Sequence, residues 1–272
     1  MSRAITGRVI AVTGGAAGIG RAIAEQLAAA GARVAIGDRD GAGARRAAVA
    51  ITGEAAGFDL DVADTESFRT FLAAVQAHWG PIDVLVNNAG VMWVGSFDEE
   101  PEDATRRQLE VNLHGVIRGV KAAVPAMRAR GTGHIVTIAS AASKVAPPGE
   151  ATYAATKHGV LGYLRAVRAE LRGSGVQLSV IMPGVVDTEL ARGTATGAAR
   201  LLRPDEVARA VVGVIEHPRF EVTVPRFIRF AAPLIELLPQ AARDVVLARL
   251  VPNQITSTDK ESRRKYEDGS LR

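Results

Sequence analysis

The sequence predicts an α/β fold in which a doubly wound parallel sheet of about seven strands carries helices on both faces. Short apolar, β-branched segments alternate with helical stretches throughout the chain. This order is typical of parallel strands joined by right-handed crossovers. In addition, 47% of the 272 residues are hydrophobic, which is enough to bury both faces of a sheet within one domain.

Each strand is predicted from an apolar run bounded by polar or glycine-rich residues. Helices are predicted over residues 19–30, which are rich in Ala, Leu and Ile, and over residues 150–171. Another helix begins at residues 203–206, where a proline and two acidic residues stand at its start. The predicted strands are residues 8–12, 33–36, 58–62, 84–86, 134–138, 178–182 and 220–225.

Glycines cluster between the first predicted strand and the following helix, at Gly14, Gly15, Gly18 and Gly20. Glycine permits positive φ angles and lets the backbone approach a ligand closely. The N-terminus of the helix offers free N–H groups and a partial positive charge, which suit a pyrophosphate. The cluster therefore predicts a phosphate-binding turn. Because its spacing differs from the common G-x-G-x-x-G fingerprint, a tight turn in an unrelated α/β protein is the alternative.

A carboxylate stands after the second predicted strand, where dinucleotide-binding folds hold the adenosine ribose. Asp38 comes 18 residues after Gly20, close to the expected spacing of about 20. A carboxylate there would bind the ribose hydroxyls and repel a 2′-phosphate, so the sequence favours NAD over NADP. Arg39 could stabilise that phosphate, which keeps NADP as an alternative. Residues 38–41 could otherwise be a solvated turn and helix cap.

Further motifs follow the other predicted strands. They are Asp61 and Val62, Asn87 to Gly90, Asn112 within a helix, Pro183 and Gly184, and Thr188. With the turn at residues 13–20, they resemble the short-chain dehydrogenase/reductase family of the TG-x3-G-x-G type over about residues 7–190. The resemblance implies a single-domain Rossmann-like fold, a nicotinamide cofactor, and hydride exchange between an alcohol and a carbonyl.

The chemistry of the middle of the chain supports that implication. Tyr153 and Lys157 are four residues apart in a predicted helix, so both side chains project from one face. A neighbouring ammonium and a cationic nicotinamide ring would lower the tyrosine pKa from about 10 and make Tyr153 a usable acid or base. Ser140 follows an apolar strand, where open α/β sheets place ligands, and its hydroxyl could bond the substrate oxygen.

The resemblance assigns roles to four of these residues. It implies that Ser140 orients the substrate, Tyr153 transfers the proton, and Lys157 also holds the nicotinamide ribose. Asn112 would support a proton relay through water. Each has an ordinary structural alternative: a packed tyrosine ring, a solvated lysine, a turn-forming serine, and an asparagine bonded to nearby backbone.

The resemblance also implies a set of nucleotide contacts. Asp61 would lie near the adenine amino group, although it could equally cap the next helix. Thr188 would contact the nicotinamide carboxamide, with a helix cap as its alternative. The implied cofactor residues are Gly14, Ala17, Gly18, Ile19, Gly20, Asp38, Arg39, Asp61, Val62, Asn88, Ala89, Gly90, Tyr153, Lys157, Pro183, Gly184, Val186 and Thr188.

Apolar residues are expected to approach the reacting carbon, so a hydrophobic secondary alcohol or ketone is the predicted substrate. Lys144 and Arg192 could instead bind an acid. By resemblance the substrate residues are Met92, Trp93, Ala141, Ala142, Val145, Val185, Val186 and Leu190. A dinucleotide-sensing protein without chemistry and a nucleotide-sugar enzyme on the same scaffold are the alternatives. Neither is favoured, because Tyr153 and Lys157 are both present, and the glycine spacing and short C-terminal region disfavour the nucleotide-sugar enzyme.

The C-terminal third departs most from the family pattern. One domain is predicted over residues 1–255, including an apolar, arginine-containing extension at about 227–251, followed by a charged, flexible tail at 256–272. The extension could cover the substrate pocket, form a subunit interface, or lie on a membrane surface. Burial against the protein itself or a second subunit is favoured, because apolar helical stripes more often pack than anchor.

Composition narrows the remaining possibilities. The absence of cysteine excludes disulfides and thiol catalysis, and the five histidines show no zinc-ligand spacing, so no metal is expected. The net charge of +4 is spread along the chain, which argues against nucleic-acid binding. The N-terminal residues contain no apolar signal segment. The sequence therefore predicts a cytoplasmic homodimer or homotetramer.

Overall fold

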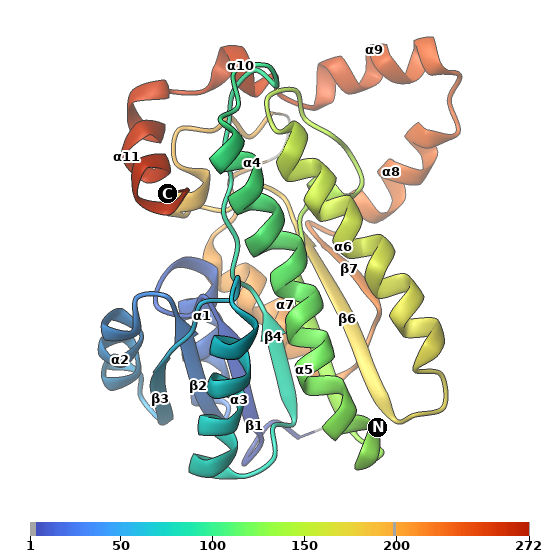
Figure 1. Ribbon diagram of the computed structural model, residues 1–272. Coiled ribbons are helices and arrows are strands. Elements are labelled where there is room, and N and C mark those ends of the chain that lie inside the picture. Colours follow the sequence, from blue (N-terminus) through green and yellow to red (C-terminus); the bar gives the residue numbers. More distant parts are fainter. Residues whose placement is uncertain (1–3, 198–199, 272) are drawn as a thin grey trace.

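The computed structural model describes residues 4–197 and 200–271 and shows a parallel sheet with helices on both faces (Figure 1). Residues 1–3, 198–199 and 272, which include parts of the predicted N-terminal segment and tail, lie outside the described residues. In the described chain the strand order is β3-β2-β1-β4-β5-β6-β7, which confirms the predicted doubly wound fold. The strands are β1 (Val9–Thr13), β2 (Arg33–Asp38), β3 (Glu54–Asp59), β4 (Val84–Asn87), β5 (Gly133–Ile138), β6 (Val176–Pro183) and β7 (Glu221–Val224).

Helices connect successive strands, and within the described residues four more helices follow the last strand. A π-helical turn, Leu109–His114, joins the fourth helix to the fifth without a break. The helices are α1 (Gly18–Ala29), α2 (Gly41–Ala50), α3 (Thr65–Trp79), α4 (Glu102–Gln108), α5 (Gly115–Ala129), α6 (Ala151–Glu170), α7 (Pro204–Glu216), α8 (Ile228–Glu236), α9 (Gln240–Leu250), α10 (Gln254–Ser257) and α11 (Lys260–Ser270).

Successive strand residues contribute side chains to two apolar layers in turn, one on each face of the sheet. Ile10 and Val12 point into the layer beneath α1 and α7, whereas Val9 and Ala11 point into the layer beneath α3, α5 and α6. Leu85, at the centre of the sheet, is fully buried. Side chains of a strand alternate between faces, so apolar residues at every position are required when both faces are covered. Helices α8 to α11 lie together at one end of this sandwich (Figure 1).

The third strand begins and ends earlier than its hydrophobicity predicts. It spans Glu54–Asp59 and pairs with β2 through small residues such as Gly57, which lies against the backbone of α2. A strand of alanine and glycine gives a weak apolar signal, whereas Leu60 and Val62, just beyond it, give a strong one. Those two residues belong to the connection into α3.

The C-terminal residues are helical, which differs from the predicted flexible tail. Helix α11 is capped by Asp259, whose side chain accepts from the backbone of Glu261 and Ser262. Arg263 is 2% exposed and donates hydrogen bonds to the carbonyl oxygens of Met92 and Leu190. A charged composition is typical of disorder, but it cannot show that distant carbonyl groups bind a buried guanidinium. None of the helices in the described chain is long and apolar enough to span a membrane.

The fold depends on a close contact between α1 and the end of β1. A Cβ atom on Gly20 would overlap the carbonyl oxygen of Gly14 and the side-chain amide of Asn88. We expect Gly20→Ala to lower the free energy of unfolding by about 2 kcal/mol, because neither neighbour can move without disturbing the sheet. Urea denaturation would measure the loss.

Gly213 provides a matched control, because it lies in α7 and a Cβ atom there would meet nothing within 4 Å. Gly213→Ala should leave stability unchanged or raise it by up to about 1 kcal/mol, since alanine is the better helix former. Equal stability of the Gly20 variant and this control would contradict the packing described above.

Candidate active site

A cavity of about 570 Å³ lies where the carboxyl ends of the strands meet the C-terminal helices. It brings together residues separated by most of the chain, from Gly14 to Ser270. All of the predicted catalytic and cofactor residues line it except Gly20 and Asn112. No group of His, Cys, Asp and Glu side chains in the described part of the chain could hold a metal ion.

The glycine turn forms one wall of the cavity. Gly14 and Gly18 have φ angles of 64° and 54°, which suit glycine far better than other residues. The side-chain amide of Asn88 donates to the carbonyl oxygens of Thr13 at 2.9 Å and Gly14 at 3.0 Å. A Cβ atom on Gly14 would come within 2.9 Å of the Cα atom of Ala89. These contacts leave an open cradle at the N-terminus of α1, which fits a pyrophosphate.

Asp38 lies beside the glycine turn, at the carboxyl end of β2. Its carboxylate lines the cavity and accepts from the backbone N–H groups of Ala16 at 3.0 Å and Asp40 at 3.1 Å. The same side chain therefore braces the glycine turn. Arg39 also lines the cavity, and its guanidinium donates to the carbonyl oxygen of Gly269 in α11 at 3.0 Å. Asp61 also lines the cavity, and its carboxylate accepts a hydrogen bond from the backbone N–H of Ala63.

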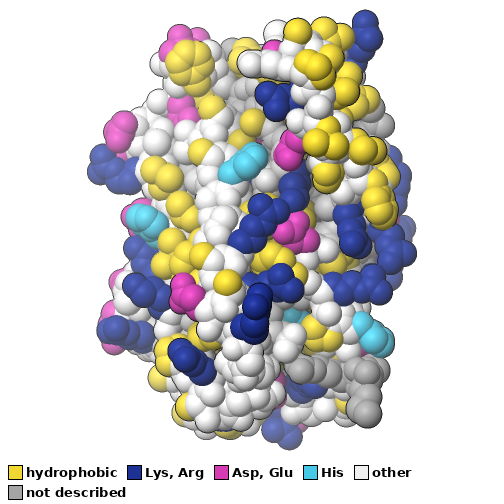
Figure 2. Space-filling model, turned by 90° about the vertical axis from the view of Figure 1, so that its right-hand side faces the viewer, with side chains coloured by type: hydrophobic (Ala, Val, Ile, Leu, Met, Phe, Trp, Pro, Cys, Tyr) yellow, Lys and Arg dark blue, Asp and Glu magenta, His cyan; other side chains and the backbone are white. Residues whose placement is uncertain are grey.

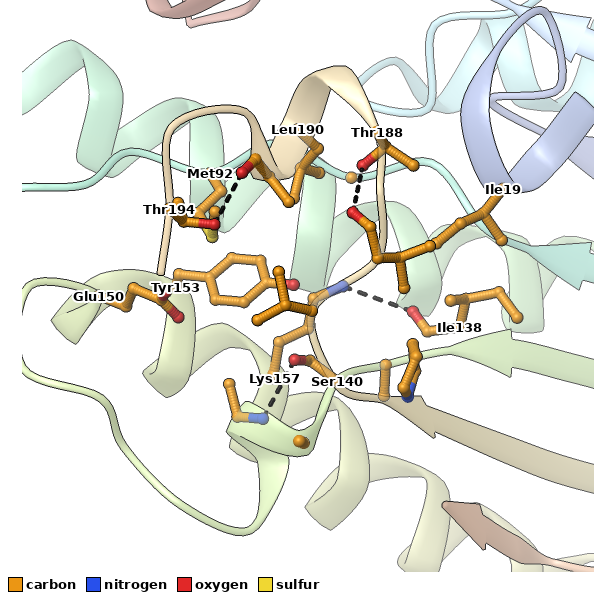
Figure 3. A pocket seen from close by; sticks show the side chains of 18 of the residues that line it. Ile19, Met92, Ile138, Ser140, Glu150, Tyr153, Lys157, Thr188, Leu190 and Thr194 are labelled. Atoms are coloured by element: carbon orange, nitrogen blue, oxygen red, sulfur yellow. Dashed lines mark hydrogen bonds between the residues drawn. The ribbon is translucent and has the colours of Figure 1, made fainter. Parts of the chain in front are cut away.

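Three of the four predicted catalytic side chains, those of Ser140, Tyr153 and Lys157, lie together in the cavity (Figure 3). Tyr153 and Lys157 come from α6, and Ser140 follows β5. The Nζ atom of Lys157 lies 5.4 Å from the centre of the Tyr153 ring and donates to the carbonyl oxygen of Ile138 at 3.4 Å. Tyr153 and Lys157 are 7% and 4% exposed, so both titrate in an apolar environment.

Burial governs the charge state of both groups. It raises the pKa of Tyr153 above its usual value, and the negative charge of Glu150 acts in the same direction, while a hydrogen bond with Ser140 opposes them. Burial also lowers the pKa of Lys157 to about 8. The sequence predicts a tyrosine pKa lowered by the neighbouring ammonium together with a cationic nicotinamide ring. Among the protein's own groups, desolvation is the largest influence on Tyr153 and raises its pKa.

Asn112 lies behind the site, in the π-helical turn. Its side chain accepts from the backbone N–H of Val91 at 2.8 Å and donates to the carbonyl oxygen of the same residue at 2.8 Å. It also donates to the hydroxyl of Thr156 at 3.3 Å. The amide therefore holds the segment after β4 against α6. A role for Asn112 in a water relay stays a prediction.

The predicted substrate wall is largely assembled. Among its predicted residues only Trp93 does not line the cavity. Lys144 forms an ion pair with Glu221 at 2.8 Å, and Arg192 pairs with Glu189. Neither cation lines the cavity, so neither is placed to receive an acidic substrate there. The predicted substrate residues that do line the cavity, such as Met92, Ala142 and Leu190, are apolar.

Sequence reasoning missed several residues of the cavity. Glu150 stands three residues before Tyr153, one helical turn away on the same face, and this spacing could have identified it. Tyr266 and Ser270 of α11 could not be found in this way, because only the fold brings them to the cavity. The apolar extension contributes Phe227, Ile228, Ala231, Ile235, Leu247, Leu250 and Val251.

Glu150 makes the stability of the folded protein depend on pH. Its side chain is 7% exposed, and burial raises its pKa to about 7 although the charge of Arg263 opposes this. The folded protein therefore holds a proton between pH 4.5 and 7 that the unfolded chain releases, so stability falls as pH rises through this window. Between pH 4.5 and 7 the natural protein should lose on the order of 3 kcal/mol of its free energy of unfolding through this group, and Glu150→Gln should remove that loss.

Urea denaturation of both proteins at pH 5 and pH 8 checks this expectation. The variant should gain stability relative to the natural protein as the pH rises. A difference between the two proteins that stays constant over this range would show that Glu150 titrates at its ordinary value.

Comparison with known proteins agrees with this geometry. Residues 8–198 match the family described as short chain dehydrogenase. The 3-oxoacyl-(acyl-carrier-protein) reductase FabG of Escherichia coli (strain K12) is 34% identical over 75% of this chain and 88% of its own length. "Probable oxidoreductase EphD" of Mycobacterium tuberculosis (strain H37Rv) is 32% identical over 92% of this chain, which spans 44% of that protein.

A solved structure shows the same architecture. The crystal structure of gox2181 has a TM-score of 0.76 and 29% sequence identity, and it covers 82% of this chain and 96% of its own. The sequence match extends over the glycine turn, Ser140, Tyr153 and Lys157, which the cavity brings together. The protein is therefore an oxidoreductase that belongs to the short-chain dehydrogenase family.

Proposed function

We propose that this protein interconverts a secondary alcohol and a ketone on a hydrophobic substrate, using NAD in preference to NADP. The observation that carries the proposal is one cavity in which the Tyr153 hydroxyl, the Lys157 amine and the Ser140 hydroxyl share space with an open nucleotide cradle. A proton-transfer group and a dinucleotide site within the same apolar cavity suit hydride chemistry on a carbonyl.

Each residue performs a separate part of the reaction. The residues that line the cradle would hold a nicotinamide dinucleotide, which when bound would supply or accept the hydride at the substrate carbon. Tyr153 gives its phenolic proton to the ketone oxygen during reduction and takes the hydroxyl proton during oxidation. Ser140 holds that oxygen beside the phenol. Lys157 provides a positive charge that stabilises the phenolate left after proton donation.

The pKa directions support Tyr153 as the proton donor. A buried phenol with a raised pKa stays protonated at neutral pH, so it is ready to protonate a ketone oxygen. Oxidation of an alcohol needs the phenolate, which a positive nicotinamide ring would stabilise. The cofactor charge therefore favours the protonation state that each direction requires.

The apolar wall supports a hydrophobic substrate. Met92, Ala142 and Leu190 pack around the Tyr153 ring. The name of the E. coli relative refers to a 3-oxoacyl group, which is a ketone on an aliphatic chain. Acyl ketones therefore belong in a first substrate panel beside cyclic and branched secondary alcohols. The predicted cytoplasmic location, the absence of nucleic-acid partners and the dimeric or tetrameric state remain predictions.

Replacing the tyrosine tests the chemistry directly. Tyr153→Phe should lower kcat by about 10²- to 10⁴-fold, because the proton donor is lost while the ring still fills the cavity. The measurement is the oxidation or formation of reduced nicotinamide across the substrate panel, with cofactor affinity followed by fluorescence. Affinity should be unchanged. Normal turnover by the variant would overturn the mechanism, and cofactor binding without turnover of any substrate by the natural protein would favour a binding role.

The cofactor preference has its own test at Asp38. An asparagine keeps one oxygen to accept from the Ala16 backbone but removes the negative charge that repels a 2′-phosphate. We expect Asp38→Asn to raise the ratio of kcat/KM for NADP over NAD by about tenfold, the value of one lost charge interaction. If the natural protein already prefers NADP, or if the ratio does not change, the assignment of NAD is wrong.

A further inference from the structure

The segment of residues 226–250, here called the hairpin, consists of α8, the two residues before it, α9 and the connection between the helices. One side of it carries large apolar side chains that no described part of the protein covers. Phe230 and Leu234 are each 65% exposed, and Leu237 is 81% exposed. Their spacing of four and three residues places them on one helical face. Hydrophobic side chains gather at the corresponding end of the molecule (Figure 2).

The opposite side of the hairpin forms part of the active-site cavity. Ile228, Ala231 and Ile235 of α8 line the cavity, and Leu247 and Leu250 of α9 do so as well. Helix α8 is therefore apolar in two directions, toward the cavity and toward solvent. The sequence favours burial of the extension against the protein itself or against a second subunit. Packing on the protein itself explains the inner side chains but not the exposed outer ones.

The hairpin also carries exposed positive charge. Arg226, Arg229 and Arg249 are exposed and Arg243 is partly exposed. None of the four forms an ion pair with any residue in the described ranges. Two acidic residues, Glu236 and Asp244, lie in the same stretch, so four positive and two negative charges leave the hairpin at +2. Other arginines, such as Arg118 and Arg165, are paired with glutamates.

We propose that the hairpin docks on an anionic lipid surface. Its outer apolar residues would enter the boundary between headgroups and acyl chains, while the unpaired arginines bind lipid phosphates. Docking in this manner requires no spanning helix. A second copy of the chain fits less well, because a two-fold contact would place the patch against itself and bring the arginines of both copies together.

Docking would also place the cavity beside the bilayer. Ile228, Ala231 and Ile235 on the inner side of α8 line the cavity, so the cavity and the lipid would lie on opposite sides of this helix. A hydrophobic ketone dissolved in the membrane could then enter the cavity without crossing bulk water. This consequence depends on the proposed function, whereas the docking itself does not.

Vesicle sedimentation tests the docking with the full chain. One set of vesicles contains phosphatidylcholine alone, and the other contains equal parts phosphatidylglycerol and phosphatidylcholine, at about 0.1 M salt. The protein should bind the anionic set, and higher salt should weaken the binding. Leu234→Ser with Leu237→Ser should lower the partition coefficient by at least about tenfold, since two side chains lose their apolar environment. Arg226→Glu with Arg229→Glu should lower it similarly.

The chain offers matched controls for both substitutions. Val49 is 89% exposed on α2, and Arg128 is exposed near the end of α5, far from the hairpin in the sequence. Val49→Ser and Arg128→Glu should leave vesicle binding unchanged. Tyr153→Phe should also bind normally, which separates a failure of the docking proposal from a failure of the proposed chemistry.

Three outcomes would overturn the proposal. The natural protein could fail to bind anionic vesicles, or the hairpin variants could bind as well as the controls. In the third outcome, sedimentation velocity would show an oligomer that the Leu234 and Leu237 substitutions dissociate while lipid binding is absent. This last result would assign the patch to a second copy of the chain.

Discussion

The packing of the glycine turn against the ends of β1 and β4 positions everything else in the active site. Asn88 ties the turn to the neighbouring strand through the carbonyl oxygens of Thr13 and Gly14, while the hydroxyl of Thr13 accepts from the backbone of Asn88 and Ala89. Asp38 braces the same turn from β2. Because three adjacent strands hold it, the N-terminus of α1 faces the cavity in one fixed orientation.

Desolvation is the second constraint, and it explains why the two walls differ. The glycine turn presents backbone groups to the cavity, whereas Tyr153, Lys157 and Glu150 are almost completely buried. Burial opposes charge on all three side chains: it raises the tyrosine and glutamate pKa values and lowers that of the lysine. A substrate oxygen entering this wall would therefore meet a neutral Tyr153 phenol, while Lys157, with a pKa of about 8, keeps most of its positive charge at neutral pH.

The C-terminal helices complete the cavity in two different ways. Helix α11 is held by polar contacts, because Arg263 binds the carbonyl oxygens of Met92 and Leu190, and the guanidinium of Arg39 donates to the carbonyl oxygen of Gly269. Helices α8 and α9 are held by apolar contacts on one side only. The first arrangement closes the site with the protein's own residues, whereas the second leaves Phe230, Leu234 and Leu237 exposed.

The sequence by itself determined the order of strands and helices along the chain, the glycine turn, and the three side chains to which we assign the chemistry. These features have local signatures: the apolar period of a strand, the need for positive φ, and the spacing of one helical turn. Tertiary structure decided the rest. The pKa direction of Tyr153 depends on burial, which is a sum over distant residues. The helical C-terminus depends on Arg263 finding carbonyl groups 171 and 73 residues away. Only the tertiary structure shows that one side of the hairpin lines the cavity and the other is exposed. A hydrophobic pattern in the sequence identifies apolar helix faces but not the groups that cover them.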